Sequence, residues 1–221
     1  MEFNYKLIRS RRRTVCLEIR NGELVVRAPI MAPQRIIEGF IKSKKDWIAR
    51  RLTKSQKTFK RQYKEGEPFF YLGNEMPLRI IKTNLKNPEV QLENGRLVIL
   101  ANNISRHILK EALIEFYKTQ AEKVILKIIK KHESKFGAYG KATTKDYKSK
   151  WGSCTSKNNL SFSAKLAMAP RDVIEYVVLH ELSHIEQKNH SKNFWSLVKS
   201  VDDRYNEKRK WLKANHHKLI L

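Results

Sequence analysis

The chain has 221 residues, 41% of them hydrophobic, which is enough for one domain or two small ones with a packed core. Its 46 Lys and Arg against 22 Asp and Glu give a formal charge of +24 and favour an anionic partner. Cys16 and Cys154, far apart, exclude a disulfide framework. With no signal-like N-terminus and no run near the roughly 20 apolar residues of a membrane span, we expect a cytoplasmic location and no transmembrane segment.

The first sixty residues predict a hairpin followed by a basic helical segment. Residues 14–27 alternate apolar and polar side chains on both sides of Asn21-Gly22, a β-hairpin signal. Residues 33–56 carry apolar side chains at helical spacing, Trp47 among them, with Lys and Arg largely on the other side. That basic face is either simply solvated or contacts phosphates, so non-specific nucleic acid is a candidate partner.

A second β-rich stretch covers residues 68–100 and contains the turn Asn94-Gly95. It resembles the first hairpin, either through an old duplication or because Asn-Gly hairpins converge easily. Residues 105–136 then predict a long amphipathic helix. Residues 143–167 predict two short strands, the first containing Tyr147 and Trp151. An exposed edge there would accept an extended peptide, or the pair would merely cover the core.

The next helix, starting at Pro170, carries the run His180-Glu181-Leu182-Ser183-His184. Two imidazoles four residues apart lie on one face of a helix and can bind one metal ion. Glu181 is rotated by about 100° from His180, so it can accept a proton from bound water without being a ligand. The surrounding apolar residues predict a buried helix, where unpaired His and Glu would be costly.

His190 is the candidate third ligand, which places a demand on the backbone. In a continuous helix it would lie roughly 9 Å beyond His184 and about 120° away around the axis. The helix must therefore break, and Asn189 is suited to the left-handed conformation just past a helix end. Metzincin proteases share the ten-residue span but carry Gly where this chain has Gln187, which argues against that group.

The chain carries several further motifs that point to one family. They are Trp151-Gly152-Ser153-Cys154, Leu160-Ser161-Phe162, Ala169-Pro170, Tyr176-Val177-Val178, the run 180–184, and Asn189-His190-Ser191 with Phe194-Trp195. Together they resemble the YgjP-like metallopeptidases, predicted metal-dependent hydrolases related at the site to SprT-like and other zincins. The resemblance extends through Arg9-Ser10-Arg11-Arg12-Arg13-Thr14-Val15 and Trp47-Ile48. It implies zinc held by His180, His184 and His190, with Glu181 as the catalytic base.

The fold class expected is α+β, with a β-rich region over residues 1–103 and a small zincin-like catalytic domain over residues 104–221. The leading function is zinc-dependent peptide hydrolysis. Candidate substrate contacts just before the metal helix are Lys148, Lys150, Trp151 and Ser153.

Three other functions remain open. Lys148, Lys150 and Lys165 could neutralise a nucleoside triphosphate that loses pyrophosphate. The basic surface could instead deliver a protease to nucleic-acid-bound proteins. In a non-enzymatic binding module, Cys154, His216 or His217 would close a structural zinc site as the fourth ligand. Candidate oxyanion donors are Tyr147, Tyr176, Tyr205 and Arg204, and candidate carboxylates behind the ligands are Glu175 and Asp202.

Overall fold

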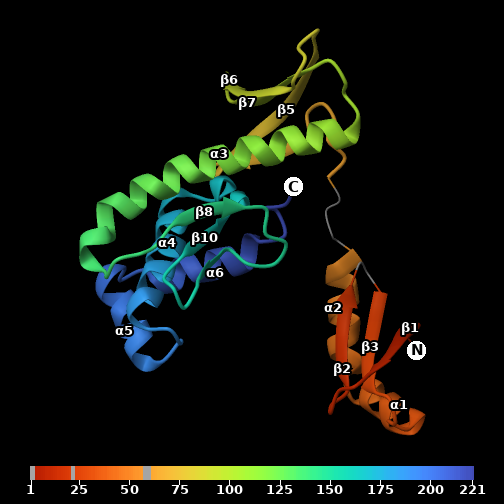
Figure 1. The fold of residues 1–221 in the computed structure, drawn as a ribbon. Helices are drawn as coiled ribbons and strands as arrows, with labels where there is room; N and C mark the ends of the chain where they lie inside the picture. The colour runs from red at the N-terminus through yellow and green to blue at the C-terminus, as the bar shows by residue number, and fades with distance from the viewer. Residues whose placement is uncertain (1–2, 21–22, 57–60) are drawn as a thin grey trace. The chain divides into compact units, whose positions relative to one another are not determined.

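A computed structural model describes residues 3–20, 23–56 and 61–221, and confirms the α+β class. The chain divides into two compact units, Met1–Lys60 and Arg61–Leu221 (Figure 1). The boundary predicted at residues 103 and 104 falls inside the second unit, where the four strands before it pack with the helices after it. No helix in the described ranges combines the length and the apolar character needed to cross a membrane.

The first unit is a three-stranded sheet with two helices. Its strands are β1 (Tyr5–Ser10), β2 (Cys16–Arg20) and β3 (Glu23–Pro29), in the order β1-β3-β2. The antiparallel β2–β3 pair confirms the first hairpin, although its turn lies outside the described residues. Its helices are α1 (Gln34–Ser43) and α2 (Lys45–Gln56), so the single helix expected over residues 33–56 is interrupted at Lys44. Their apolar side chains, including Ile37 and Ile48, cover the sheet.

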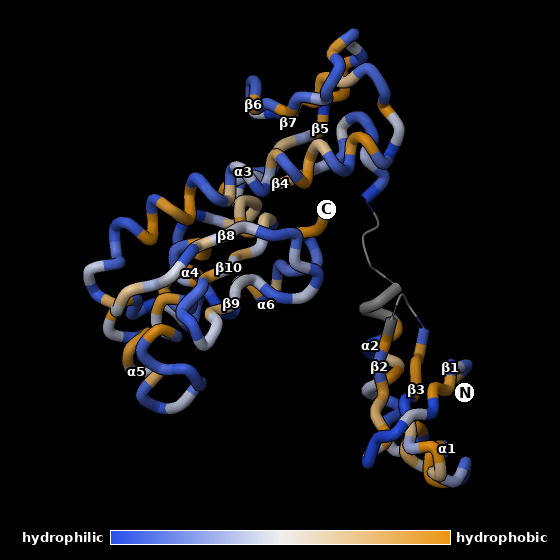
Figure 2. Tube along the Cα trace, viewed as in Figure 1, coloured by the Kyte–Doolittle hydropathy of each residue, from blue (hydrophilic) through white to orange (hydrophobic). Residues whose placement is uncertain are grey.

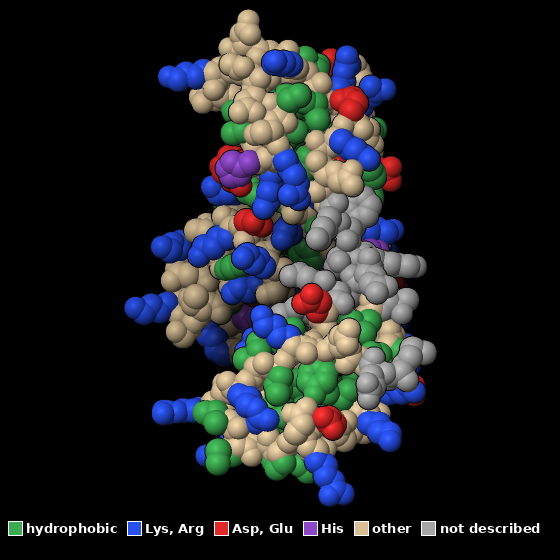
Figure 3. Space-filling model, turned by 90° about the vertical axis from the view of Figure 1, so that its right-hand side faces the viewer, with side chains coloured by type: hydrophobic (Ala, Val, Ile, Leu, Met, Phe, Trp, Pro, Cys, Tyr) green, Lys and Arg blue, Asp and Glu red, His purple; other side chains and the backbone are tan. Residues whose placement is uncertain are grey.

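Trp47 departs from the expectation of a core residue. It is 36% exposed, and the guanidinium of Arg51 lies 5.8 Å from the centre of its ring. The next residue, Ile48, is fully buried and fills the core position instead. On the face drawn in Figure 3, Lys and Arg side chains are spread over the surface and are more widespread than Asp and Glu.

The second unit begins with a four-stranded sheet of order β4-β5-β7-β6. The strands are β4 (Pro68–Tyr71), β5 (Asn74–Lys82), β6 (Glu89–Glu93) and β7 (Arg96–Ala101). Asn94 and Gly95 adopt φ of 47° and 73°, the left-handed pair that a two-residue hairpin turn needs, so the second hairpin is confirmed.

One pairing pattern recurs in all three sheets. A strand is followed by a hairpin whose second strand runs parallel to it, as in β1-β3-β2, β5-β7-β6 and the sheet β8-β10-β9. The strands of the last sheet are β8 (Ala142–Lys145), β9 (Gly152–Cys154) and β10 (Leu160–Ser163). The β9–β10 connection contains no Asn-Gly, so the pattern belongs to the topology and not to that dipeptide.

The long helix α3 (Arg106–His132) joins the two sheets of the second unit and confirms the predicted amphipathic helix. A short 3-10 turn, η1 (Glu133–Lys135), follows it. In Figure 1, α3 runs between the β5–β7 sheet and the β8–β10 sheet, and Figure 2 shows hydrophobic and hydrophilic residues alternating along it. The hydroxyl of buried Tyr117 donates to the carbonyl of Phe70 over 2.7 Å and fastens α3 to β4.

The region before the metal helix differs from the prediction of two strands over residues 143–167. It holds three strands, β8 to β10, and a 3-10 helix, η2 (Ala164–Met168). Tyr147 and Trp151 lie in the connection between β8 and β9, because the first strand ends at Lys145. Three helices complete the chain, namely α4 (Arg171–Glu186), α5 (Lys192–Val201) and α6 (Tyr205–Asn215).

Candidate metal centre

The helix that carries the histidines, α4, is the buried centre of the second unit. Pro170 stands at its N-cap, and the carbonyl of Pro170 accepts the first helical hydrogen bond, from Ile174, over 3.0 Å. Apolar side chains from Val173 to Leu182 are buried, as the sequence predicts. His180 and His184 therefore project from a rigid element, with ring centres 5.0 Å apart.

The structure confirms the predicted break in the helix between His184 and His190, but the residue that makes the break is Gln187 and not Asn189. Helix α4 ends at Glu186, and Gln187 turns the chain away with φ −126° and ψ 98°. Asn189 is not among the residues with a left-handed backbone, so its expected role is wrong. Its side-chain oxygen instead accepts from the backbone N–H of Ser191 over 3.2 Å, and Ser191 then caps α5.

The three imidazoles converge after this turn. One ligand nitrogen from each of His180, His184 and His190 lies within 4.8 Å of the others, and the Nε2 atoms of His180 and His190 are 3.1 Å apart. Ligands of a tetrahedral zinc ion at about 2.0–2.1 Å lie roughly 3.3 Å from one another. The spacing thus fits a divalent metal ion, with small adjustments of the rings.

The tautomer of His184 is also set for binding. Its Nδ1 lies 2.9 Å from the carbonyl oxygen of Gln187, which can only accept, so Nδ1 carries the hydrogen and Nε2 is left as the ligand. Glu175 and Asp202, considered as carboxylates behind the ligands, contact other residues. Within the described ranges, Nδ1 of His180 is buried without a hydrogen-bond partner.

Aromatic rings from α5 and α6 hold the ligands in place. Phe194 stacks on His184 with centroids 4.4 Å apart, and Trp195 stacks on His190 at 5.6 Å. Tyr205 stacks on the same indole, and the guanidinium of Arg209 lies 4.8 Å from the centre of the Trp195 ring. The metal-facing orientation of the imidazoles is therefore supported by packing.

Protonation of the histidines is disfavoured. Burial lowers the pKa of His180 to about 3, with further lowering from His184, His190 and Arg209. Burial also lowers the pKa of His184. Both rings are neutral at physiological pH, the form that binds a metal ion.

Glu181 lies against the edge strand β9. It is only 5% exposed, and burial raises its pKa to about 8, against lowering by Lys150 and by a hydrogen bond from the backbone of Cys154. A Cβ on Gly152 would lie 2.6 Å from Glu181 Oε1 and 2.7 Å from its Cγ. Only glycine at position 152 leaves room for this carboxylate.

The candidate substrate contacts do not form one group. The ammonium of Lys150 donates to Ser153 Oγ over 3.2 Å and lies 4.5 Å from the centre of the Tyr147 ring. Trp151 is half-buried against the core, and Lys148 is exposed on the β8–β9 connection. Of the four candidates, Lys150 and Ser153 are thus joined, and Ser153 lies on β9 itself.

Other residues considered from sequence fall in different places. Cys154, His216 and His217 are outside the histidine cluster found among the described residues. Arg204 lines a separate cavity, while the ring of Tyr176 lies 5.9 Å from that of His180. Sequence reasoning missed the roles of Gly152 and Arg209. The only signal for Gly152 was its place in the motif of residues 151–154, and none existed for Arg209.

A helix with two histidines and a buried Glu, completed by a third histidine after a turn, defines the class of metal-dependent hydrolases. The family model of the YgjP-like metallopeptidase domain matches residues 13–215. The chain belongs to this YgjP-like metallopeptidase family, which confirms the resemblance drawn from its motifs. A search among curated proteins found no match.

Proposed function

We propose that the protein is a zinc-dependent peptidase in which His180, His184 and His190 hold the metal ion and Glu181 is the general base. The observation that carries this proposal is the convergence of three imidazoles beside a buried carboxyl group. Three protein ligands leave a fourth position for water or substrate, as in catalytic zinc sites. A closed structural site would need a fourth side chain there.

Zinc, when bound, would lower the pKa of a water molecule toward about 7 and polarise a substrate carbonyl. Glu181 accepts a proton from the attacking water and passes it to the leaving amine. The nearby divalent charge would favour the ionised carboxylate over the protonated form that burial alone favours. The stacked rings of Phe194 and Trp195 keep the imidazoles from rotating during these steps.

The edge of β9 supports a peptide as the substrate. Backbone groups of Trp151 and Thr155 bond toward the β10 side, to Ser163 and Asn159. In an antiparallel ladder the alternate residues, Gly152 and Cys154, point their polar groups the other way. The outward N–H of Cys154 reaches Glu181, so an extended chain paired with this edge would lie beside the base.

Two other functions have weaker support. Nucleotide hydrolysis needs free lysines, but Lys165 donates to the carbonyl of Tyr147 over 2.8 Å and lies 3.6 Å from Asp146. The hypothesis that the basic surface delivers a protease to nucleic-acid-bound proteins is supported only by the charge of +24. It predicts that DNA stimulates cleavage at low salt and not at high salt.

The test offers zinc-loaded protein a pool of denatured protein and a pool of nucleoside triphosphates. Release of peptides that is lost in Glu181→Gln would support the proposal. Glu115→Gln, at an exposed position of α3, is the matched control and should retain wild-type activity. Pyrophosphate release with the same dependence on Glu181 would assign nucleotide hydrolysis instead, and activity in neither pool would reject both.

A further inference from the structure

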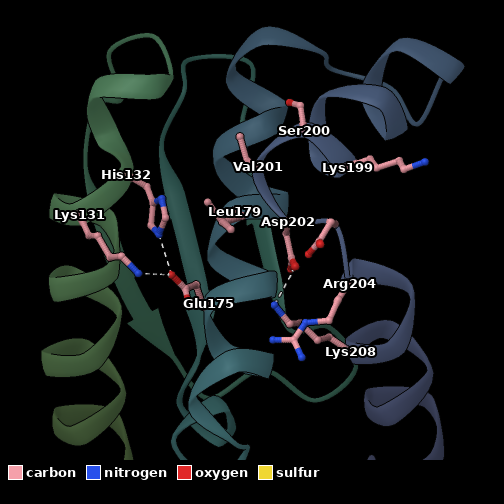
Figure 4. Close-up of a pocket in the computed structure, with 11 residues that line it drawn as sticks. Lys131, His132, Glu175, Leu179, Lys199, Ser200, Val201, Asp202, Arg204 and Lys208 are labelled. Carbon is pink, nitrogen blue, oxygen red and sulfur yellow. Dashed lines mark hydrogen bonds and ion pairs between the residues drawn. The ribbon is translucent and has the colours of Figure 1, made fainter.

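The second unit contains a cavity of about 360 Å³ that none of the metal-centre residues lines. It lies where the end of α3 and the middle of α4 meet the end of α5 and the connection to α6 (Figure 4). Figure 4 shows charged side chains from all of these elements around it. Its size is typical of sites for small molecules, about 300–1,000 Å³.

Two ion pairs build the wall of this cavity. Glu175 Oε1 accepts from Lys131 Nζ over 2.9 Å and lies 2.7 Å from His132 Nε2, which joins α3 to α4. Asp202 Oδ1 accepts from Lys208 Nζ over 2.8 Å, and both of these residues are buried. The charged groups are therefore held in fixed positions, as a binding site requires.

Two buried atoms in the wall have no partner within the described part of the chain. They are Asp202 Oδ2 and His132 Nδ1, in side chains whose residues are each only 7% exposed. Nε2 of His132 lies against Glu175, so Nδ1 is the ring nitrogen that is left without a partner. A buried polar atom without a hydrogen-bond partner is costly, so both atoms favour a ligand that supplies one.

Hydroxyl groups suit these two atoms better than an ammonium group does. The ammonium of Lys208 already lies 2.8 Å from the same carboxylate of Asp202. A second positive charge at Oδ2 would be repelled by it, whereas a neutral O–H can donate without that penalty. Because a hydroxyl can both donate and accept, the two atoms select a ligand with hydroxyls.

The same cavity attracts an anion. Lys199 and Arg204 line it, and no hydrogen bond or ion pair to another side chain is found for either within the described ranges. Counting all lining residues, four Lys and Arg side chains face three carboxylates, so the cavity keeps a positive excess. Arginine can bind a phosphate through two parallel hydrogen bonds, which makes Arg204 the main candidate contact.

We propose that this cavity is a binding site for a small phosphorylated sugar. One of its hydroxyls would donate to Asp202 Oδ2 and another would pair with His132 Nδ1, and its phosphate would bind Arg204 and Lys199. The site is separate from the metal centre and does not depend on the proposed peptidase activity, although Leu179 in its wall directly precedes His180 on α4.

The test is calorimetric titration of the full chain with ribose 5-phosphate, ribose and inorganic phosphate, with and without a metal chelator. We expect ribose 5-phosphate to bind at least tenfold more tightly than either fragment, and binding to survive the chelator. The double variant Lys199→Gln/Arg204→Gln should weaken binding at least tenfold. Lys192→Gln, an exposed lysine at the start of the same helix α5, should leave it unchanged.

Asp202→Asn tests the hydroxyl contact, because the amide replaces an acceptor with a donor. It should reduce the affinity for ribose 5-phosphate toward that for phosphate alone. The exposed double variant keeps the proposal testable even if Asp202→Asn fails to fold. Equal affinity for phosphate and ribose 5-phosphate, no binding at millimolar concentration, or full binding by the double variant would each overturn the proposal.

Discussion

Gly152→Ala is expected to damage catalysis while sparing the metal ligands. The new Cβ would lie 2.6 Å from Glu181 Oε1 and 2.9 Å from its Cδ, whereas ordinary contacts are 3.4–4 Å. The carboxylate must therefore move by about 0.8 Å, the difference between 3.4 and 2.6, and misplacement on this scale can cost roughly 10²-fold in rate. Overpacking should also lower the free energy of unfolding by about 1–3 kcal/mol.

The assay is kcat/KM for cleavage of a denatured protein, with bound zinc and unfolding in urea measured on the same preparation. Gly39→Ala is the control, because nothing lies within 4 Å of a Cβ added at that position of α1. It should retain full activity. Wild-type cleavage by Gly152→Ala would refute the close approach of β9 to Glu181. A loss of zinc equal to the loss of activity would show that the substitution acts through the metal ligands and not through Glu181.

Three further predictions concern the stability of the second unit, each measured by urea unfolding. Lys208→Met should lower the free energy of unfolding by about 3–5 kcal/mol, because it leaves the carboxylate of Asp202 buried without its partner. Adding Asp202→Asn to that variant should recover part of the loss, and a double variant whose loss is the sum of the two single losses would contradict this. Burial raises the pKa of Glu175, but hydrogen bonds from Lys131 and His132 outweigh it and lower the pKa overall. The contribution of Glu175 to the free energy of unfolding is therefore present above the ordinary carboxyl pKa and is lost as the pH falls. Glu175→Gln should be destabilising at pH 7 and nearly neutral at pH 3. A loss of stability that is the same at both pH values would contradict this role of Glu175. Tyr117→Phe should cost about 1–3 kcal/mol, because the carbonyl of Phe70 loses its donor, and no change would show that this bond is not needed.

The elements that have strong periodicity or characteristic turn residues can be predicted from the sequence alone. The two Asn-Gly turns predict both hairpins, and the spacing of His180, His184 and His190 predicts a break in the helix that the structure confirms. These features depend on local rules, such as two residues per strand repeat and 3.6 per helical turn. Such rules act within a few residues and are visible without the fold.

Features that are set by tertiary contacts could not be predicted from the sequence. Lys44 interrupts the basic helix, and Gln187 ends α4 by adopting an extended backbone, although neither residue type signals a break. Position 152 requires glycine because Glu181, twenty-nine positions later, lies against it. Only the packing of β9 on α4 brings these two residues together. The division of the chain at residues 60 and 61 likewise reflects the packing of β4–β7 with α3.

The most direct test of the account measures the zinc-to-protein ratio and the rate of new N-terminus formation on the same samples. Wild type and Glu181→Gln are compared on one denatured protein. We expect equal zinc, near one ion per chain, with cleavage by the wild type alone. Cleavage that continues in Glu181→Gln at full zinc occupancy would contradict the assignment of Glu181 as the base, and a wild type that binds no zinc would contradict the metal centre itself.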